Sequence, residues 1–190
     1  MKHLVWILAA VLPGTAAPRD DRSVGVPNAP IRVEVFSSFD CPACKQLHEQ
    51  FLPLLVRDYV VQGKVYLVPH ECPLEGHPLA RKAADYATAA ARVGKYWAVA
   101  DALFEHQADW EGRGEVWTTV AAVLTPAERA QVQSLAHDPA VDAEVQRDVA
   151  RRLQYIPTII VTSKFKSYPI NGMPDFGLFR RLLDGLLNGR

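Results

Sequence analysis

The sequence predicts a small α/β fold whose sheet is interrupted along the chain by a helical segment. Residues 31–68 show strand, helix and strand patterns, residues 77–153 show helical patterns, and strand patterns return at 159–170. A length of 190 residues suits one domain. With 49% apolar and 22% charged residues, the composition is that of an ordinary globular protein and excludes a largely disordered chain.

The first elements form a strand, helix, strand unit. Ile31–Phe36 alternates branched apolar residues with charged ones, which predicts a strand. Between residues 42 and 62, apolar residues recur at spacings of three and four and predict a helix, which Pro53 should kink. Val65–Val68 predicts the second strand. Two strands joined through a helix form a right-handed parallel unit.

The helical insertion covers about residues 77–153, which are rich in Ala, Leu, Glu and Arg. The expected helices occupy residues 79–93, 95–107, 116–124 and 126–153, the last broken near 137–139. The chain then returns to the sheet and ends in an amphipathic helix. The expected elements are strands at 159–161 and 168–170, a turn at Asn171-Gly172 and a helix at 175–187.

The N-terminus has the pattern of a secretory signal peptide over residues 1–16. A short basic start precedes nine apolar residues, Leu4–Leu12, and then small residues suited to cleavage after Ala16. Nine residues of helix span about 14 Å, far less than the roughly 30 Å of a bilayer core, so a spanning helix is excluded. A buried N-terminal helix is the alternative. We expect an extended segment at 17–30, a domain at 31–190, and a periplasmic or otherwise extracytoplasmic location.

The charges and cysteines narrow the function further. Lys+Arg and Asp+Glu are both 21, so no basic field exists that would gather nucleic acid. Three cysteines are too few for a disulfide scaffold, and an odd number cannot all pair within one chain. The positions of the three sulfurs therefore decide the chemistry.

Two of these cysteines form the motif Cys41-Pro42-Ala43-Cys44, where the first strand gives way to the first helix. Proline favours the first helical position, which makes Cys41 the N-cap and puts Cys44 on the same helix face. A Cys41 thiolate would lie at the positive end of the helix dipole, where a thiol pKa falls from about 8.5 to roughly 3.5–7.5. Asp40 opposes this effect by its charge, and neither intervening residue offers a side-chain donor. The spacing predicts a reversible disulfide.

Two other interpretations of these cysteines remain open. A metal site could combine Cys41, Cys44 and Cys72 with His70 or His77, giving three sulfurs and one imidazole. A purely structural disulfide is also possible, although closing so short a loop removes little entropy from the unfolded chain. Because a proline directly follows the first cysteine at a strand-to-helix junction, we favour redox chemistry and expect neither metal nor cofactor.

Three stretches, in their order and spacing, resemble the DsbA-like branch of the thioredoxin superfamily. They are Val33–Lys45, which contains the two-cysteine motif, Gly76–Ala80 at the start of the insertion, and Ile156–Thr158 at the start of a strand. The resemblance covers about residues 31–187. It implies a thioredoxin fold with an inserted helical subdomain in an exported protein thiol:disulfide oxidoreductase.

The resemblance also implies roles for individual residues. Cys41 and Cys44 would be catalytic, Pro157 would be cis and pack beside them, and the backbone of Ile156 would bind an extended substrate segment. Three apolar residues would form a rim suited to unfolded polypeptide: Phe39, Pro42 and Ile156.

Two further residues have open assignments. Glu34 is either a possible proton relay for the second cysteine or a solvent-facing strand acid. Cys72 is either a buried unreactive thiol, a partner for another protein, or an auxiliary redox thiol.

We favour an oxidase that introduces disulfides into unfolded or partly folded cysteine-containing proteins. A monomer is expected, and the resemblance implies a membrane quinone-linked partner of the DsbB or vitamin K epoxide reductase type that reoxidises it. A reductase or isomerase using the same pair is the alternative. Two departures from DsbA-type oxidases support it: no histidine lies between the cysteines, and Ile156 before the proline is more typical of reducing thioredoxins.

Overall fold

The computed structural model describes residues 22–164 and 166–189. The predicted signal peptide and the start of the predicted extended segment lie outside these residues. Val24, in the described part of that segment, forms an isolated antiparallel bridge with Leu67. Among the described residues, no helix is long and apolar enough to cross a membrane.

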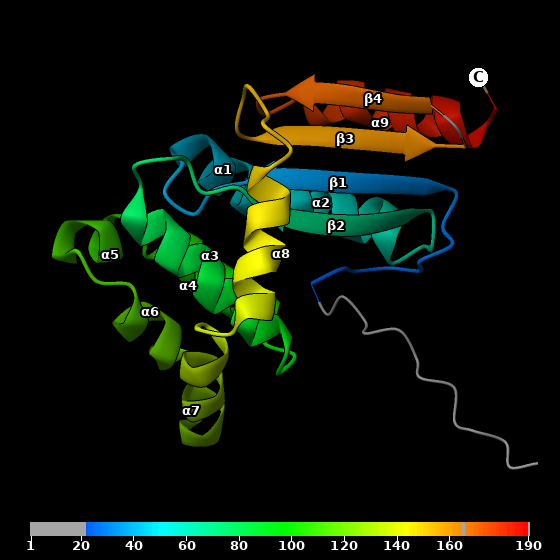
Figure 1. Cartoon of the computed structure of the whole chain (residues 1–190). Helices are drawn as coiled ribbons and strands as arrows, with labels where there is room; N and C mark the ends of the chain where they lie inside the picture. Colours follow the sequence, from blue (N-terminus) through cyan, green and yellow to red (C-terminus); the bar gives the residue numbers. More distant parts are fainter. Residues whose placement is uncertain (1–21, 165, 190) are drawn as a thin grey trace, which may run out of the picture.

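One four-stranded sheet organises the molecule, with the strand order β2-β1-β3-β4 (Figure 1). The strands are β1 (Ile31–Ser37), β2 (Val65–Glu71), β3 (Thr158–Ser163) and β4 (Lys166–Asn171). β1 pairs with β2 in parallel, whereas β3 is antiparallel to both β1 and β4. The predicted parallel unit and the later return to the sheet are therefore confirmed.

β2 extends three residues beyond its predicted end at Val68. Pro69, His70 and Glu71 continue the pairing with β1, and Glu71 lies opposite Ser37. Proline is tolerated here because β2 is an edge strand of the described sheet, where a missing N–H need not interrupt a ladder. The extension brings Glu71 to the strand ends from which the first helix starts.

The first helical run connects β1 to β2 and is irregular around Pro53, as expected. It comprises α1 (Pro42–Gln46), the π-helical turn η1 (Leu47–Phe51), α2 (Leu52–Leu55) and a second π-helical turn η2 (Val56–Val60). Pro53 has no backbone N–H for a regular helical hydrogen bond. Two wider turns therefore flank the short α-helical stretch that contains it.

Six helices between β2 and β3 form the insertion, at the lower left of Figure 1. They are α3 (Pro78–Ala91), α4 (Tyr96–Glu105), α5 (Gln107–Arg113), α6 (Trp117–Ala122), α7 (Pro126–Leu135) and α8 (Pro139–Val149). α5 was not predicted, and the last predicted helix, 126–153, was too long. α8 gives way at Val149 to an irregular segment in which Arg152 has a φ of 48°, a conformation that no regular helix contains.

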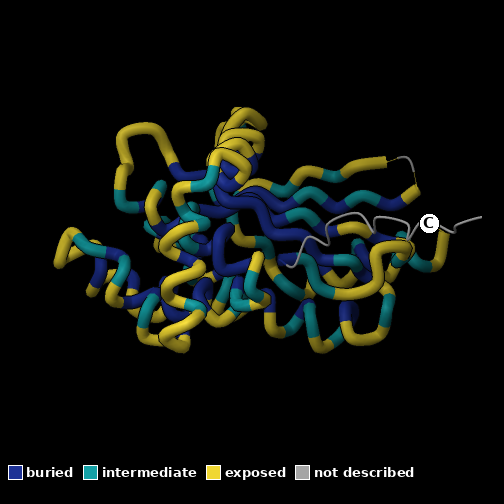
Figure 2. Tube along the Cα trace, turned by 60° about the horizontal axis from the view of Figure 1, so that its bottom comes forward, coloured by how far each residue is buried: buried dark blue, intermediate teal, exposed yellow. Residues whose placement is uncertain are grey.

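Two hydrophobic clusters stabilise these layers. The sheet core lies between β1, β3, the first helical run and α9 (Phe176–Leu187), which begins one residue after its predicted start. The insertion core lies among α3, α4 and their neighbours and includes Phe39 and Cys44. Figure 2 shows the buried strands at the centre, with exposed segments around them. Cys44 is thus part of the insertion core, and Cys41 packs against it.

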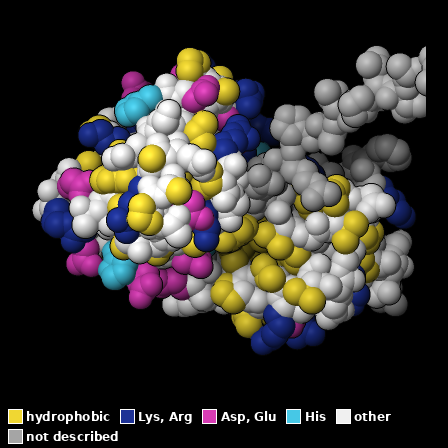
Figure 3. Space-filling model, turned by 90° about the horizontal axis from the view of Figure 1, so that it is seen from below, with side chains coloured by type: hydrophobic (Ala, Val, Ile, Leu, Met, Phe, Trp, Pro, Cys, Tyr) yellow, Lys and Arg dark blue, Asp and Glu magenta, His cyan; other side chains and the backbone are white. Residues whose placement is uncertain are grey.

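Seen from below, charged side chains are frequent over the insertion, on the left, and hydrophobic side chains gather right of centre (Figure 3). An apolar groove of about 470 Å³ lies between the first helical run and α4 and is lined by Leu52, Val56, Val61 and Trp97 among others. Val61 is 77% exposed.

Candidate active site

Cys41 occupies the N-cap of α1, as the position of Pro42 predicted. Its sulfur accepts a hydrogen bond from the backbone N–H of Cys44 at 3.3 Å. The backbone N–H of Cys41 donates to the Ser38 carbonyl at 3.2 Å and fixes the turn that leads out of β1. The sulfur is half-buried, so a substrate can reach it while helix amides still face it.

The two cysteines of the motif have opposite acidities. Hydrogen bonds from the Cys44 thiol and from backbone amides lower the pKa of Cys41 to about 6, although burial and the charge of Asp40 oppose this. The pKa of Cys44 is raised because its thiol donates to the Cys41 sulfur and because it is buried. Near pH 7, Cys41 is therefore mainly thiolate and Cys44 is thiol, a division that suits a nucleophile and a resolving group.

The loop before β3 closes the other side of Cys41. The Ile156–Pro157 peptide bond is cis, as the family resemblance implied. The Cys41 thiol lies 3.8 Å from the Ile156 carbonyl oxygen. The Pro157 carbonyl accepts a hydrogen bond from the Gly172 N–H at 2.7 Å, which ties this loop to the end of β4. The structure thus brings Pro157 and Ile156 to the two-cysteine motif over more than one hundred residues of sequence.

The predicted apolar rim is only partly exposed. Pro42 is exposed and Ile156 is half-buried, whereas Phe39 is 1% exposed and packs against Phe104 with a ring separation of 4.9 Å. Phe39 therefore lies in the insertion core and is not a rim residue, because its ring fills the space between β1 and α4. Tyr155, which sequence reasoning missed, is 58% exposed beside Ile156 and offers apolar surface in its place.

Glu34 lies in an ion-pair network on β1 and β2. It accepts from His70 Nε2 at 3.1 Å, and Arg32 and Arg151 lie within 4 Å. The hydrogen bond from His70 and the nearby Arg32 lower the pKa of Glu34 to about 2. A carboxylate that stays ionised near neutral pH is poorly suited to relaying protons, so the Glu34 relay stays a prediction that its surroundings do not favour.

Glu71 is the buried acid whose charge acts on Cys44. It is 1% exposed, burial raises its pKa to about 7, and its negative charge raises the pKa of Cys44. Tyr96 donates to one carboxyl oxygen, whereas the other, Oε2, has no hydrogen-bond partner among the described residues. Sequence analysis did not single out Glu71. The signal that could have found it is an acidic residue directly after an apolar strand, in His70-Glu71-Cys72.

Cys72 belongs to a different set of contacts, on α8. Its thiol lies 3.4 Å from the Asp148 carbonyl oxygen and is 7% exposed. Burial and the charges of Asp148 and Glu71 raise the pKa of Cys72 well above the usual range for a thiol. Of the three interpretations left open for Cys72, the buried unreactive thiol fits these surroundings best.

The ligand set of the metal alternative is not assembled. His70 bonds through both ring nitrogens, to Asp148 at 2.7 Å and to Glu34 at 3.1 Å. His77 bonds to Asp40. No group of three or more His, Cys, Asp or Glu side chains within residues 22–164 and 166–189 is arranged to hold a metal ion. The donors of the proposed set are already engaged with protein partners.

Comparison with known proteins agrees with this geometry. Residues 18–172 match the family described as Thioredoxin. The probable disulfide bond formation protein D of Bacillus cereus is 24% identical over 177 residues, covering 86% of this chain and 77% of the relative. The structure of Wolbachia pipientis alpha-DsbA1 superposes with a TM-score of 0.76 at 20% identity, covering 94% of each chain. Oxidised BdbD from Bacillus subtilis gives 0.72 at 21% identity, covering 88% of this chain and 92% of BdbD.

The family match covers well over half of the chain, and the fold neighbours share its inserted helices. The predicted thioredoxin fold with an inserted helical subdomain is confirmed. The chain belongs to the thioredoxin family, and in sequence and fold it is similar to DsbA-like thiol:disulfide oxidoreductases.

Proposed function

We propose that the chain is an exported oxidase that introduces disulfides into cysteine-containing proteins through the Cys41–Cys44 pair. The observation that carries this proposal is the contrast in acidity between the two cysteines. A stabilised Cys41 thiolate stabilises the reduced enzyme, which makes the disulfide form a better oxidant.

The reaction begins with the Cys41–Cys44 disulfide. A substrate thiolate attacks the Cys41 sulfur, the Cys41–Cys44 bond breaks, and Cys44 leaves as a thiolate that takes up a proton. A second substrate thiolate then attacks the substrate sulfur of the mixed disulfide and releases Cys41 as a thiolate. The substrate loses two electrons and gains one disulfide, and the enzyme becomes the dithiol. The low pKa of Cys41 speeds this second step, since a more acidic thiol leaves faster.

Substrate binding would involve the surface next to Cys41. The exposed Pro42 and the half-buried Ile156 flank the reactive sulfur, and the Ile156 carbonyl already lies within 4 Å of it. An extended segment could lie along this loop through backbone hydrogen bonds and apolar contacts. Such contacts suit unfolded clients of varied sequence, and we propose that the enzyme acts on them as a monomer.

The location and the reoxidising partner complete the proposal. Residues 1–16 would direct export and be removed, and disulfides form and persist outside the cytoplasm. A reduced oxidase needs an electron acceptor for each cycle. We propose a membrane quinone-linked partner of the DsbB or vitamin K epoxide reductase type, which would accept two electrons from the Cys41–Cys44 dithiol.

Titration of the mature chain in glutathione buffers tests the direction of exchange. The pair should have a potential above about −230 mV, and alkylation with intact-mass analysis should find Cys72 reduced throughout. A potential near about −270 mV, the range of thioredoxin, would favour the reductase alternative. The Cys72→Ser variant is the matched control, because it should titrate like the wild type.

A further inference from the structure

Asp40 is an electrostatic obstacle to the chemistry of Cys41. The carboxyl group precedes the reactive cysteine in sequence, and its negative charge raises the pKa of the Cys41 thiol. Its side chain is 14% exposed, so water alone screens it incompletely. An unrestrained carboxylate at this position would disfavour the thiolate on which the exchange reaction depends.

Two donors hold the Asp40 carboxylate. Ser38 Oγ donates to Oδ1 at 2.5 Å from the same loop, and His77 Nδ1 forms a short hydrogen bond with Oδ2 from the start of α3. Both carboxylate oxygens are therefore engaged with groups other than the Cys41 thiol. The second contact joins the β1–α1 loop to an element 37 residues away.

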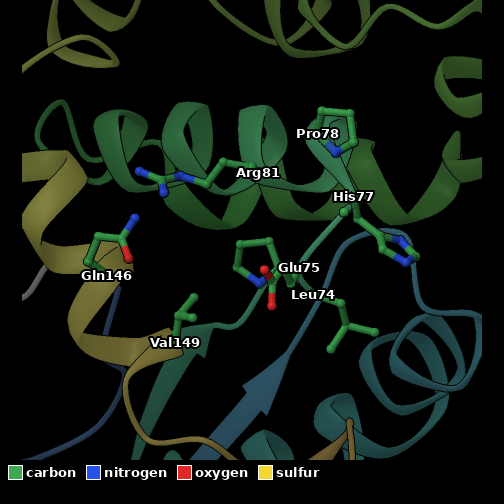
Figure 4. A pocket seen from close by; sticks show the side chains of 9 residues that line it. Leu74, Glu75, His77, Pro78, Arg81, Gln146 and Val149 are labelled. Atoms are coloured by element: carbon green, nitrogen blue, oxygen red, sulfur yellow. The ribbon is translucent and has the colours of Figure 1, made fainter.

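The backbone around His77 holds this residue at the start of α3. His77 is the N-cap of α3 with Pro78 at the first helical position. Its N–H donates to the Leu74 carbonyl at 3.2 Å, and its own carbonyl accepts from the Arg81 N–H at 3.1 Å. Figure 4 shows the ring pointing away from Arg81 and Gln146, toward the blue loop that follows β1. The imidazole thus has a defined orientation toward the active-site loop.

We propose that His77 is a positioning residue for Cys41: its imidazole holds the Asp40 carboxylate and screens its charge from the reactive sulfur. The proposal rests on the proposed role of Cys41 as the nucleophile. No histidine lies between the two cysteines of this chain. In its place, a histidine at the start of α3 contacts the residue that precedes the motif. His77 touches neither sulfur and acts through Asp40.

One further charged group faces this pair. Glu111 of α5 lines, with Asp40 and His77, a cavity of about 350 Å³. Burial and the charge of Asp40 raise the pKa of Glu111, and His77 lowers it. The three groups therefore interact electrostatically. His77 shares this cavity with both carboxylates, and removing it should increase the negative potential beside Cys41.

A double-mutant cycle tests the proposal on the full mature chain. The variants are His77→Ser, Asp40→Asn and the double variant. Serine is favoured at helix N-caps and is too short to replace the imidazole at Asp40, so α3 should be preserved. The readouts are the rate of Cys41 alkylation below its pKa, followed by mass spectrometry, and the equilibrium constant with glutathione.

We expect His77→Ser to raise the pKa of Cys41 by about half to one unit. This lowers the thiolate fraction below the pKa about three- to tenfold, and the oxidising equilibrium constant at pH 7 about three- to fivefold. The same substitution in the Asp40→Asn background should change neither. His77→Gln, which can still donate to Asp40, should recover most of the loss. An unchanged Cys41 in His77→Ser, an equal effect without Asp40, or a glutamine variant that behaves like serine would each overturn the proposal.

His106 supplies the matched control. Its side chain is 51% exposed, against 50% for His77, and it also pairs with an aspartate, Asp109, at 3.1 Å. His106→Ser should leave both readouts unchanged, and thermal melting should show that every variant is folded. If Cys41 of the wild type is not the thiol that alkylates first, the proposed function fails. If Cys41 alkylates first but its rate does not change in His77→Ser, only the positioning role of His77 is refuted.

Discussion

Replacing Glu71 with glutamine should change how stability depends on pH. Burial raises the pKa of Glu71 from 4.5 to about 7 in the folded chain. Between these values the folded state binds more protons at this site than the unfolded state, so its contribution to stability falls as pH rises through this window and is constant above it. Each pKa unit corresponds to about 1.4 kcal/mol, which makes the cost of ionising Glu71 about 3 kcal/mol.

Glutamine has nearly the same shape, keeps an oxygen that can accept from Tyr96, and never ionises. The difference in free energy of unfolding between Glu71→Gln and the wild type should therefore rise by about 3 kcal/mol, in favour of the variant, as the pH goes from 4.5 to 8. Urea denaturation of both reduced proteins at several pH values measures this difference. Glu105→Gln, at an exposed glutamate near the end of α4, is the control and should not reproduce this pH-dependent gain. A Glu71→Gln difference that stays constant with pH would refute the buried-acid assignment.

Two further predictions concern the cysteines and the N-terminal segment. In the folded, reduced protein at pH 7, iodoacetamide should modify Cys41 at least tenfold faster than Cys44 or Cys72, as intact mass and peptide mapping would reveal; comparable rates would contradict the assigned acidities. Arg22→Ala should lower the free energy of unfolding by about 3 kcal/mol, because it leaves buried carboxylates of α8 without this cation. A loss below about 1 kcal/mol in urea denaturation would show that these ion pairs contribute little.

The sequence alone predicts the elements whose signals are local. The alternation of apolar and charged residues at Ile31–Phe36 predicts a half-buried strand, and the proline after Cys41 predicts the start of a helix. Both signals depend on neighbouring residues, and tertiary contacts reinforce them. The same holds for the amphipathic α9, whose apolar face packs on the sheet.

Features that depend on distant contacts were missed. Pro69 interrupts the strand pattern, and only the place of β2 at a sheet edge lets pairing continue to Glu71. Phe39 looks like an exposed loop residue until α4 supplies Phe104 against its ring. The His77–Asp40 contact has no signal at all in sequence, because it depends on how α3 is placed against the β1–α1 loop.

The acidity of Cys41 sets a limit on how far this residue can tune the redox potential. With a pKa of about 6 instead of 9.0, Cys41 is mostly thiolate at pH 7, which stabilises the reduced enzyme about tenfold and raises its potential by about 30 mV. Solvent screens the half-buried sulfur, so this figure is an upper limit. Cys44 adds nothing at pH 7, because its thiol is protonated whether or not its pKa is raised. The Cys41 contribution is thus close to the gap of about 40 mV between thioredoxin, at about −270 mV, and the boundary of about −230 mV proposed for an oxidase.

Among variants at Asp40 and His77 in which the Cys41 pKa stays below 7, potential should change by about 30 mV per pKa unit. A variant whose potential departs from this relation must alter the stability of the disulfide form, through the Ile156–Pro157 loop or the client surface beside it. Its potential then no longer measures the stability of the Cys41 thiolate.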